Sequence, residues 1–448
     1  MSFRRPVWAL HVLVVGLALH NLVMSQLWRL GVRGGALSAI AAWKDVLLAA
    51  ALVALFVTRR GRLFRPGWCD WLALGFAAFV ILYGLIPQSA LGGGATHKGV
   101  LYAARHDLLP VEAYLLGRAL ALTTAEARAL VRTLLATAAG VAVFGLLDVY
   151  LIPLSFWRHA RGWYVQQLGL TYHGLSGLPE NFVYNAGHND VFRRLTSTFL
   201  SPLATGYMLV VALLVLPYRR RFSVALAALL FAALLWTHTR AALAALVLGL
   251  VVLALLRRSL VPIGLAVLVG VVGFVFVKEY EHFAPRTHFT ASEQRYQEQH
   301  AQTQPTVSND ASSANEASTR EHLSSLRAGL RTAFHHPFGF GLGNAGVTAE
   351  RTKVKVEAGE STYTELAIET GVAGALVFVA WSLLLLRRVL AAPPLAAAFA
   401  ATLLLGLQTD VVGIPWIAVV VWALAGSFAY VVRGRATQSP RPMSPASS

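Results

Sequence analysis

Residues 222–256 read FSVALAALLFAALLWTHTRAALAALVLGLVVLALL, two apolar blocks that meet at a short polar turn. Each block is about as long as a helix that crosses the hydrocarbon core of a bilayer, which takes about 20 residues. The only Lys, Arg, Asp or Glu in the stretch is Arg240, at the turn itself. The stretch therefore predicts two antiparallel membrane-spanning helices joined by a tight turn.

The same pattern recurs along the chain and predicts an all-α, polytopic integral membrane protein of about twelve transmembrane helices. The apolar blocks fall near 7–29, 35–57, 69–90, 99–122, 129–152, 198–217, 222–238, 240–256, 260–278, 362–386, 391–409 and 412–432. The fourth block is the most polar, because it contains Arg105, His106, Asp107 and Glu112.

Composition supports this fold class. Of the 448 residues, 56% are hydrophobic and 13% are charged, whereas an ordinary soluble domain carries about 25% charged residues. The formal net charge of +17 comes largely from short basic clusters between the apolar blocks, a pattern typical of membrane topology and not of nucleic-acid binding. The single cysteine, Cys69, excludes an internal disulfide and a cysteine-based metal cluster.

The basic clusters predict that both termini are cytoplasmic, since Lys and Arg are retained on that side. The predicted cytoplasmic clusters are Arg59 to Arg62, Arg128 and Arg132, Arg219 to Arg221, Arg257 and Arg258, Arg387 and Arg388, and Arg433 and Arg435. The predicted divisions are helices 1–5 in 1–152, a periplasmic loop 153–197, helices 6–9 in 198–278, a large periplasmic loop 279–361, helices 10–12 in 362–432, and a disordered tail 433–448.

The large loop is expected to contain a flexible Ser/Asn/Ala-rich segment, 308–318, followed by an amphipathic helix that starts at Thr319 and ends before Pro337. Its apolar face would comprise Leu323, Leu326, Leu330 and Phe334. Its arginines, Arg320, Arg327 and Arg331, are expected on different faces.

Two arginines are predicted at the outer ends of helices. Arg194 precedes the sixth block, and Arg240 ends the turn Trp236-Thr237-His238-Thr239-Arg240. Each could be an interfacial anchor that extends its charged head into water. Together they could instead bind one anionic ligand, because a guanidinium stays charged and pairs well with phosphate oxygens.

Residues 335–344 read HHPFGFGLGN, with alternate glycines that allow close backbone approach. A tight structural turn is the favoured interpretation. His335 and His336 lack an Asp, Glu or Cys at familiar ligand spacing, so we expect no metal site.

Three carboxylates, Glu360, Glu365 and Glu369, lie at the mouth of the tenth block, where they are costly unless paired or functional. Glu360 and Ser361 are placed to act as a base or a positioning group. Glu365 and Glu369 share a helical face and are expected to organise nearby arginines.

Other charges fall within or at the ends of the apolar blocks. Lys44 and Asp45 are expected to form a structural pair, and the charged residues of the fourth block another. Asp410 is a candidate partner for an outer arginine.

The order of these segments resembles the O-antigen ligase and polymerase superfamily, the Wzy/WaaL-type bacterial membrane glycosyltransferases. The resemblance rests on Arg194-Leu195-Thr196-Ser197-Thr198-Phe199, on Thr237 to Arg240, and on the long loop that ends in 336–343 and in Glu360 to Tyr363 through Glu369-Thr370-Gly371.

The resemblance implies transfer of a glycan from an undecaprenyl-diphosphate donor to a hydroxyl acceptor, without metal or other cofactor, at the outer face of the inner membrane. Arg194 and Arg240, with Arg320 or Arg327, would bind the diphosphate. Glu360 would be the base, and Ser361, Tyr363, Glu365, Glu369 and His336 would support the site. Expected partners are the lipid-linked oligosaccharide, a glycan or lipid A-core acceptor, membrane lipids and, as a candidate, a chain-length regulator.

The sequence departs from the ligase branch at one position. Ligases carry a histidine at the return from the large loop into the membrane, where this chain has Glu360-Ser361. A carboxylate can also act as general base, so the departure favours a polymerase-like member, with O-antigen ligation as the alternative. A flippase or secondary transporter that uses the intramembrane charges is an alternative of another class.

Overall fold

The computed structural model describes residues 5–59, 64–160, 162–164, 182–187, 190–217, 221–287, 291, 295, 317–357 and 359–435. Two parts of the sequence predictions, residues 308–316 and the tail after Arg435, lie outside these ranges, as do Arg60, Arg62, Arg219 and Arg220. The helices are α1 (Trp8–Arg29), α2 (Gly34–Ala41), α3 (Trp43–Thr58), α4 (Trp68–Leu85), α5 (His97–Leu120), α6 (Thr124–Leu151), α7 (Leu154–Arg158), α9 (Pro202–Val215), α10 (Arg221–Trp236), α11 (Arg240–Arg257), α12 (Val261–Lys278), α13 (Tyr280–Phe283), α15 (Ala317–His335), α16 (Gly346–Thr352), α17 (Thr362–Val389), α18 (Pro393–Leu405) and α19 (Pro415–Arg435), with short 3₁₀ helices η1 (Gln88–Leu91) and η3 (Ser197–Phe199).

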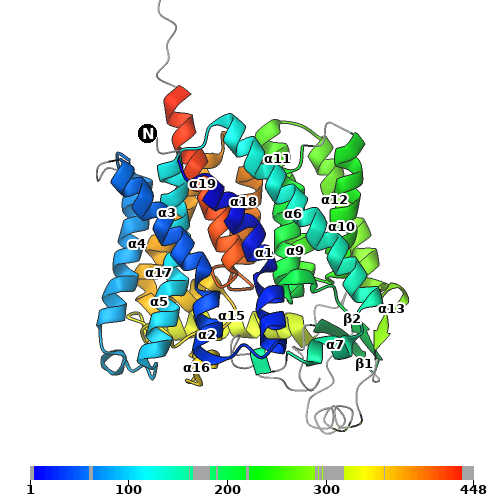
Figure 1. The fold of residues 1–448 in the computed structure, drawn as a ribbon, viewed down its shortest axis with the longest axis horizontal. Helices are drawn as coiled ribbons and strands as arrows, with labels where there is room; N and C mark the ends of the chain where they lie inside the picture. Colours follow the sequence, from blue (N-terminus) through cyan, green and yellow to red (C-terminus); the bar gives the residue numbers. More distant parts are fainter. Residues whose placement is uncertain are drawn as a thin grey trace, which may run out of the picture.

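The long helices form one bundle, and the start of α1 and the end of α19 lie at the same end of it (Figure 1). Within the described residues, six helices are long and apolar enough to cross a membrane, or seven if α2 and α3, which meet at a 40° bend, form one span. Helices α9 and α18, together with the segments Ser223–Trp236 of α10 and Pro415–Ala429 of α19, are apolar but shorter. The prediction of a multi-pass helical membrane protein is confirmed, whereas the number of twelve spans remains a prediction.

Helix α5 corresponds to the polar fourth block, and its charges have partners on other elements. Arg105 forms an ion pair with Asp45 of α3, and Lys44 donates to the carbonyl of Ala41. The ion pair of Asp45 is therefore formed with Arg105, which reaches it from α5, and not with Lys44 as predicted. Asp107 accepts from the ring of His106 at 2.8 Å, a contact within α5. The charges of α5 therefore pair partly with one another and partly with other elements.

A small antiparallel sheet, absent from the predicted all-α fold, joins the two long loops. Its order is β1 (Val183–Gly187), β2 (Asp190–Arg193) and β3 (Arg286–Thr287). β1 and β2 belong to the loop 153–197, and β3 belongs to the loop 279–361, where Arg286 pairs with Phe192. The sheet continues directly into Arg194, so it fixes where that residue leaves the loop.

Helix α15 is the amphipathic helix predicted for the large loop, and it runs across the axes of the bundle (Figure 1). Gly329 and Ala333 face α17, where a Cβ at Gly329 would lie 2.8 Å from Cβ of Thr364. The expectation that the loop arginines lie on different faces is wrong. Spacings of seven and four residues place Arg320, Arg327 and Arg331 on one side of a helix with 3.6 residues per turn, and all three are exposed.

Candidate functional site

The guanidinium of Arg194 lies against the turn that precedes α11. Its Nε donates to the Thr237 carbonyl at 3.0 Å, and Nη2 lies 3.3 Å from both the His238 carbonyl and Oγ1 of Thr239. His238 has a φ of +49°, a conformation that lets the chain turn sharply before Arg240. The structure therefore brings Arg194 close to the start of α11, although the two arginines come from separate motifs.

Arg193 and Arg194 have different surroundings, since Arg193 is the last residue of β2 and Arg194 is the first residue after it. Arg193 is buried and pairs with Asp148 at 3.3 Å, where it also donates to the carbonyl of Ile152. Arg193 is a structural residue that anchors β2 to the end of α6. Arg194 is the member of the pair placed at the Thr237–Thr239 turn.

His322 of α15 and Glu360 form the closest acid–base contact of the site. His322 Nδ1 lies 2.5 Å from Oε2 of Glu360, and the two side chains keep 28% and 40% of their surface exposed. The hydrogen bond to Glu360 raises the pKa of His322 above its ordinary value, while burial and the positive charge of Arg240 lower it. The pair is thus accessible to a substrate and lies within electrostatic reach of Arg240.

Glu360 has a φ of +75°, a left-handed conformation that is uncommon for a residue with a side chain. Its backbone N–H donates to the carboxyl group of Glu365, an interaction that helps to hold this conformation. Such backbone strain costs about 1–3 kcal/mol and is concentrated at functional sites. The conformation turns the side chain of Glu360 toward α15 immediately before α17 begins.

Ser361 and Tyr363 fix the start of α17 against the end of α18. Ser361 Oγ donates to the Gly406 carbonyl at 3.0 Å, and Tyr363 Oη donates to the Leu403 carbonyl at 2.7 Å. Both hydroxyl groups are engaged in these hydrogen bonds. They hold the backbone next to Glu360 in place and so help to position that residue.

The glycine-rich stretch 336–343 docks into a break in α17. Gly371 interrupts the helix with a φ of +70°, and the freed backbone groups bond to the turn: Phe340 N donates to Ile368 O at 2.7 Å, and Val372 N donates to Pro337 O at 2.9 Å. Gly339 is required here, since a Cβ would lie 2.4 Å from Ile368 O. The predicted structural turn is confirmed, and it holds the end of α15 on α17.

Glu365, Glu369 and Asp410, which were expected to organise arginines, contact backbone groups and a histidine; Glu365 accepts from the backbone N–H of Glu360. Glu369 Oε1 accepts from the backbone of Gly343 at 2.8 Å. Asp410 accepts from His106 Nε2 at 2.7 Å and from Thr362 Oγ1 at 3.1 Å. Glu369 thus holds the glycine-rich turn, and Asp410 holds the histidine of α5 and the start of α17.

The remaining predicted residues lie on the exposed side of α15 or at its end. Arg320 and Arg327 are exposed, and the ring of exposed His336 packs against Phe340 at 4.5 Å between centroids. The structure therefore gathers Arg194, Arg240 and Glu360 into one region, and it adds His322.

His322 is not among the site residues predicted from the sequence. His322 lies seven residues before Gly329, on the side of α15 that packs against α17, but no sequence signal places that side beside Glu360.

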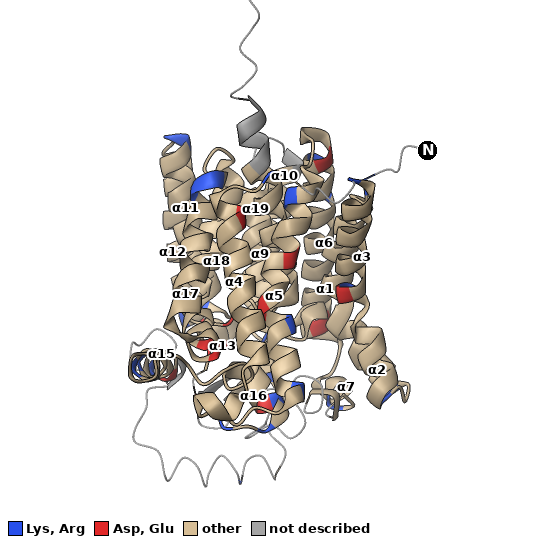
Figure 2. Cartoon of the chain, turned by 90° about the vertical axis from the view of Figure 1, so that its left-hand side faces the viewer, with Lys and Arg blue, Asp and Glu red and all other residues tan. Residues whose placement is uncertain are grey.

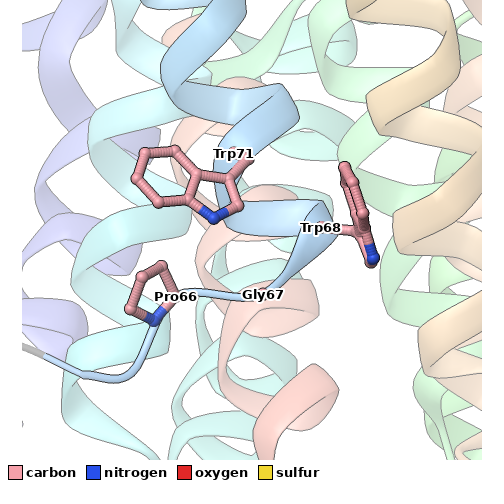
Figure 3. A pocket seen from close by; sticks show the side chains of 4 residues that line it. All are labelled: Pro66, Gly67, Trp68 and Trp71. Atoms are coloured by element: carbon pink, nitrogen blue, oxygen red, sulfur yellow. The ribbon is translucent and has the colours of Figure 1, made fainter.

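A separate open hollow lies at the first turn of α4 and is lined by Pro66, Gly67, Trp68 and Trp71 (Figure 3). The other end of α4 contacts the glycine-rich turn, where Tyr83 Oη donates to Phe338 O at 2.9 Å. The hollow is therefore at the end of α4 remote from that turn. Exposed tryptophans at a helix end are typical of the interface between a membrane and water.

The fold and site define a multi-pass helical membrane protein with two arginines and a His–Glu pair at one end of the bundle. Residues 225–379, roughly a third of the chain, match the protein family described as O-antigen ligase. The predicted resemblance to the O-antigen ligase and polymerase superfamily is confirmed by this match, which contains Arg240, His322 and Glu360 but begins after Arg194. No curated protein matches the chain.

Members of this superfamily are membrane glycosyltransferase-like enzymes that act as ligases or polymerases. In general they use a lipid-linked glycan and, for ligases, a lipid A-core acceptor. The match supports a ligase- or polymerase-like function for this chain.

Proposed function

We propose that this protein extends or transfers undecaprenyl-diphosphate-linked glycans at the periplasmic face of the bacterial inner membrane, with both termini in the cytoplasm. The observation that carries the proposal is the convergence of Arg194, Arg240 and the His322–Glu360 pair, from four separate segments, at one end of a membrane bundle. A diphosphate carried by a membrane lipid arrives at this level, and its negative charge is complementary to the two guanidinium groups.

In the proposed reaction, a hydroxyl of the acceptor attacks the anomeric carbon of the donor sugar. The bond between that carbon and the diphosphate oxygen breaks, and the hydroxyl proton moves to the carboxylate of Glu360. His322 holds this carboxylate in place through Nδ1. Arg194 and Arg240 stabilise the charge that develops on the leaving diphosphate, the role that preorganised cations have in phosphate chemistry. Direct displacement inverts the configuration at the anomeric carbon.

Polymerisation, in which the acceptor is a second lipid-linked glycan, is the primary proposal because Glu360 stands where ligases carry a histidine. One observation favours O-antigen ligation as a second candidate. His322 supplies an imidazole beside Glu360 from a different element, so a histidine is present at the site even though its position in the sequence differs.

The chain-length profile of surface polysaccharide tests the proposal and separates the two candidates. A deletion strain would be complemented with wild type, Arg194→Ala, Arg240→Ala or Glu360→Gln, at matched membrane levels. Single repeat units on lipid A-core in the three variants would support a polymerase. Long chains that stay on undecaprenyl diphosphate would support a ligase. Wild-type profiles from all three variants would contradict both the polymerase and the ligase and would favour a flippase or secondary transporter.

A further inference from the structure

Helix α15 exposes an apolar stripe that the proposed reaction does not use. Leu323, Leu330 and Phe334 are spaced by seven and four residues, so they align on one side of the helix. All three are exposed, Phe334 with 78% of its surface. The neighbouring side of the helix is already occupied, because Gly329 and Ala333 pack against α17. The stripe is therefore a second apolar face, pointing away from the protein.

A row of arginines lies directly beside the stripe. Arg320, Arg327 and Arg331 share the seven- and four-residue spacing. Each lies three residues before one of the apolar residues, so the two rows run side by side along the helix. An apolar stripe flanked by arginines is typical of a helix that lies in the plane of a membrane interface, with its apolar residues below the phosphates and its cations among them.

The placement of α15 fits such an interface. The helix runs across the bundle axes in Figure 1, and in Figure 2 it is seen end-on at the side of the bundle. A helix in this position runs parallel to the bilayer surface and lies beside the spans instead of above them.

The exposed surface of α15 also continues onto a candidate span. The chain leaves α15 through Phe338, which is 74% exposed and whose carbonyl accepts from Tyr83 near the end of α4. Leu82 and Leu85 of α4 are exposed as well, on a helix long and apolar enough to cross a membrane. The apolar surface that begins on a candidate span thus extends toward α15.

We propose that α15 is embedded in the outer leaflet of the bilayer, with Leu323, Leu330 and Phe334 among the acyl chains and Arg320, Arg327 and Arg331 at the phosphates of anionic phospholipids. The lipid contact does not depend on glycan transfer. It has a consequence for the proposed reaction, however, because His322 lies on the same helix and would be held at the depth of the lipid phosphates.

Spin labels on α15 test the proposal in the whole protein, reconstituted in vesicles of phosphatidylethanolamine and phosphatidylglycerol. In a Cys69→Ala background, labels would be placed at Leu330→Cys and Phe334→Cys, with matched controls at Glu321→Cys and Ala328→Cys on the opposite exposed side. Collision rates with oxygen, which concentrates in the bilayer, and with a water-soluble nickel chelate would be measured for each label.

The expected result is an oxygen-to-nickel ratio several-fold higher at positions 330 and 334 than at the two controls. Equal ratios at all four positions would overturn the proposal. Low accessibility of 330 and 334 to both reagents would also overturn it, because a second protein surface, and not lipid, would then cover the stripe.

Replacing phosphatidylglycerol by phosphatidylcholine tests the role of the arginines separately. A shallower position of the label at 330 is expected. An unchanged depth would contradict the contact with anionic phosphates.

Discussion

His322 Nδ1 lies 2.5 Å from Oε2 of Glu360, although 38 residues separate the two in the chain. The contact joins the amphipathic helix of the large loop to the residue that precedes α17. Because the glycine-rich turn also fixes the end of α15 in the break of α17, the geometry of the pair depends on both ends of the same loop helix.

Replacing Glu360 with Gln should lower the rate of glycan transfer by about 10²–10³-fold, since a positioned general base contributes about 10²–10⁴-fold. His322→Gln should cost less, about ten-fold, because it leaves the base in place but removes the bond that orients it. Turnover of a purified lipid-linked donor measures both. Glu281→Gln, an exposed carboxylate of α13 outside the pair, is the matched control and should keep wild-type turnover. A larger loss in His322→Gln than in Glu360→Gln would instead make the imidazole the base.

The pair should also make stability depend on pH. Glu360 and, less strongly, Glu321 raise the pKa of His322 above its ordinary value, against burial and Arg240. A histidine whose pKa is higher in the folded than in the unfolded state stabilises the fold below the unfolded pKa, and this contribution disappears as pH rises through the folded pKa. Thermal unfolding in detergent should show wild type above His322→Gln near pH 6, with the difference shrinking toward pH 9. A difference that grows with pH, or one reproduced by exposed His97→Gln, would exclude this assignment.

Arg194→Ala and Arg240→Ala should each reduce transfer by about 10²-fold or more, the scale measured when one preorganised group that stabilises developing charge is removed. Lysine at either position should restore part of the activity, because it supplies charge without the two-pronged geometry of guanidinium. Steady-state kinetics with the lipid-linked donor would measure the effect. Arg128→Ala, exposed on α6, should behave as wild type. Full activity in both Arg194→Ala and Arg240→Ala would contradict the proposed diphosphate site.

Gly339→Ala should destabilise the protein by about 1–3 kcal/mol, since its φ of +70° is strained for any side chain and the new Cβ would meet Ile368 O. The midpoint of thermal unfolding should fall, and transfer should fall with it as α15 loosens from α17. Gly140→Ala, where a Cβ meets nothing within 4 Å, provides the comparison. Equal midpoints for the two variants would show that the turn does not hold α15.

The helices were predictable because their signal is local. The stretch 222–256 contains two uninterrupted apolar blocks, and they form α10 and α11. The sheet was not predictable in this way, because β3 has two residues and pairs with a strand of another loop. Its pairing depends on how the bundle places the two loops.

The arginines of the site could be predicted as unusual charges at helix ends, but their partners could not. Nothing in the local pattern around Asp410 indicates that it accepts from His106, which lies 304 residues away. His322 has an ordinary helical position, and its importance emerges only when Glu360 is placed beside it. The shared face of Arg320, Arg327 and Arg331 was predictable, because intervals of seven and four residues are close to whole turns of a helix. The expectation of different faces misapplied this period.

Release of undecaprenyl diphosphate by the purified protein, in vesicles that contain the lipid-linked glycan and a metal chelator, tests the central claim most directly. Wild type should release undecaprenyl diphosphate in step with lengthening or transfer of the glycan, and Arg240→Ala and Glu360→Gln should release little at equal protein levels. Release that is unchanged in both variants, or wild-type protein that moves the intact lipid-linked glycan across the bilayer without cleaving it, would contradict the account.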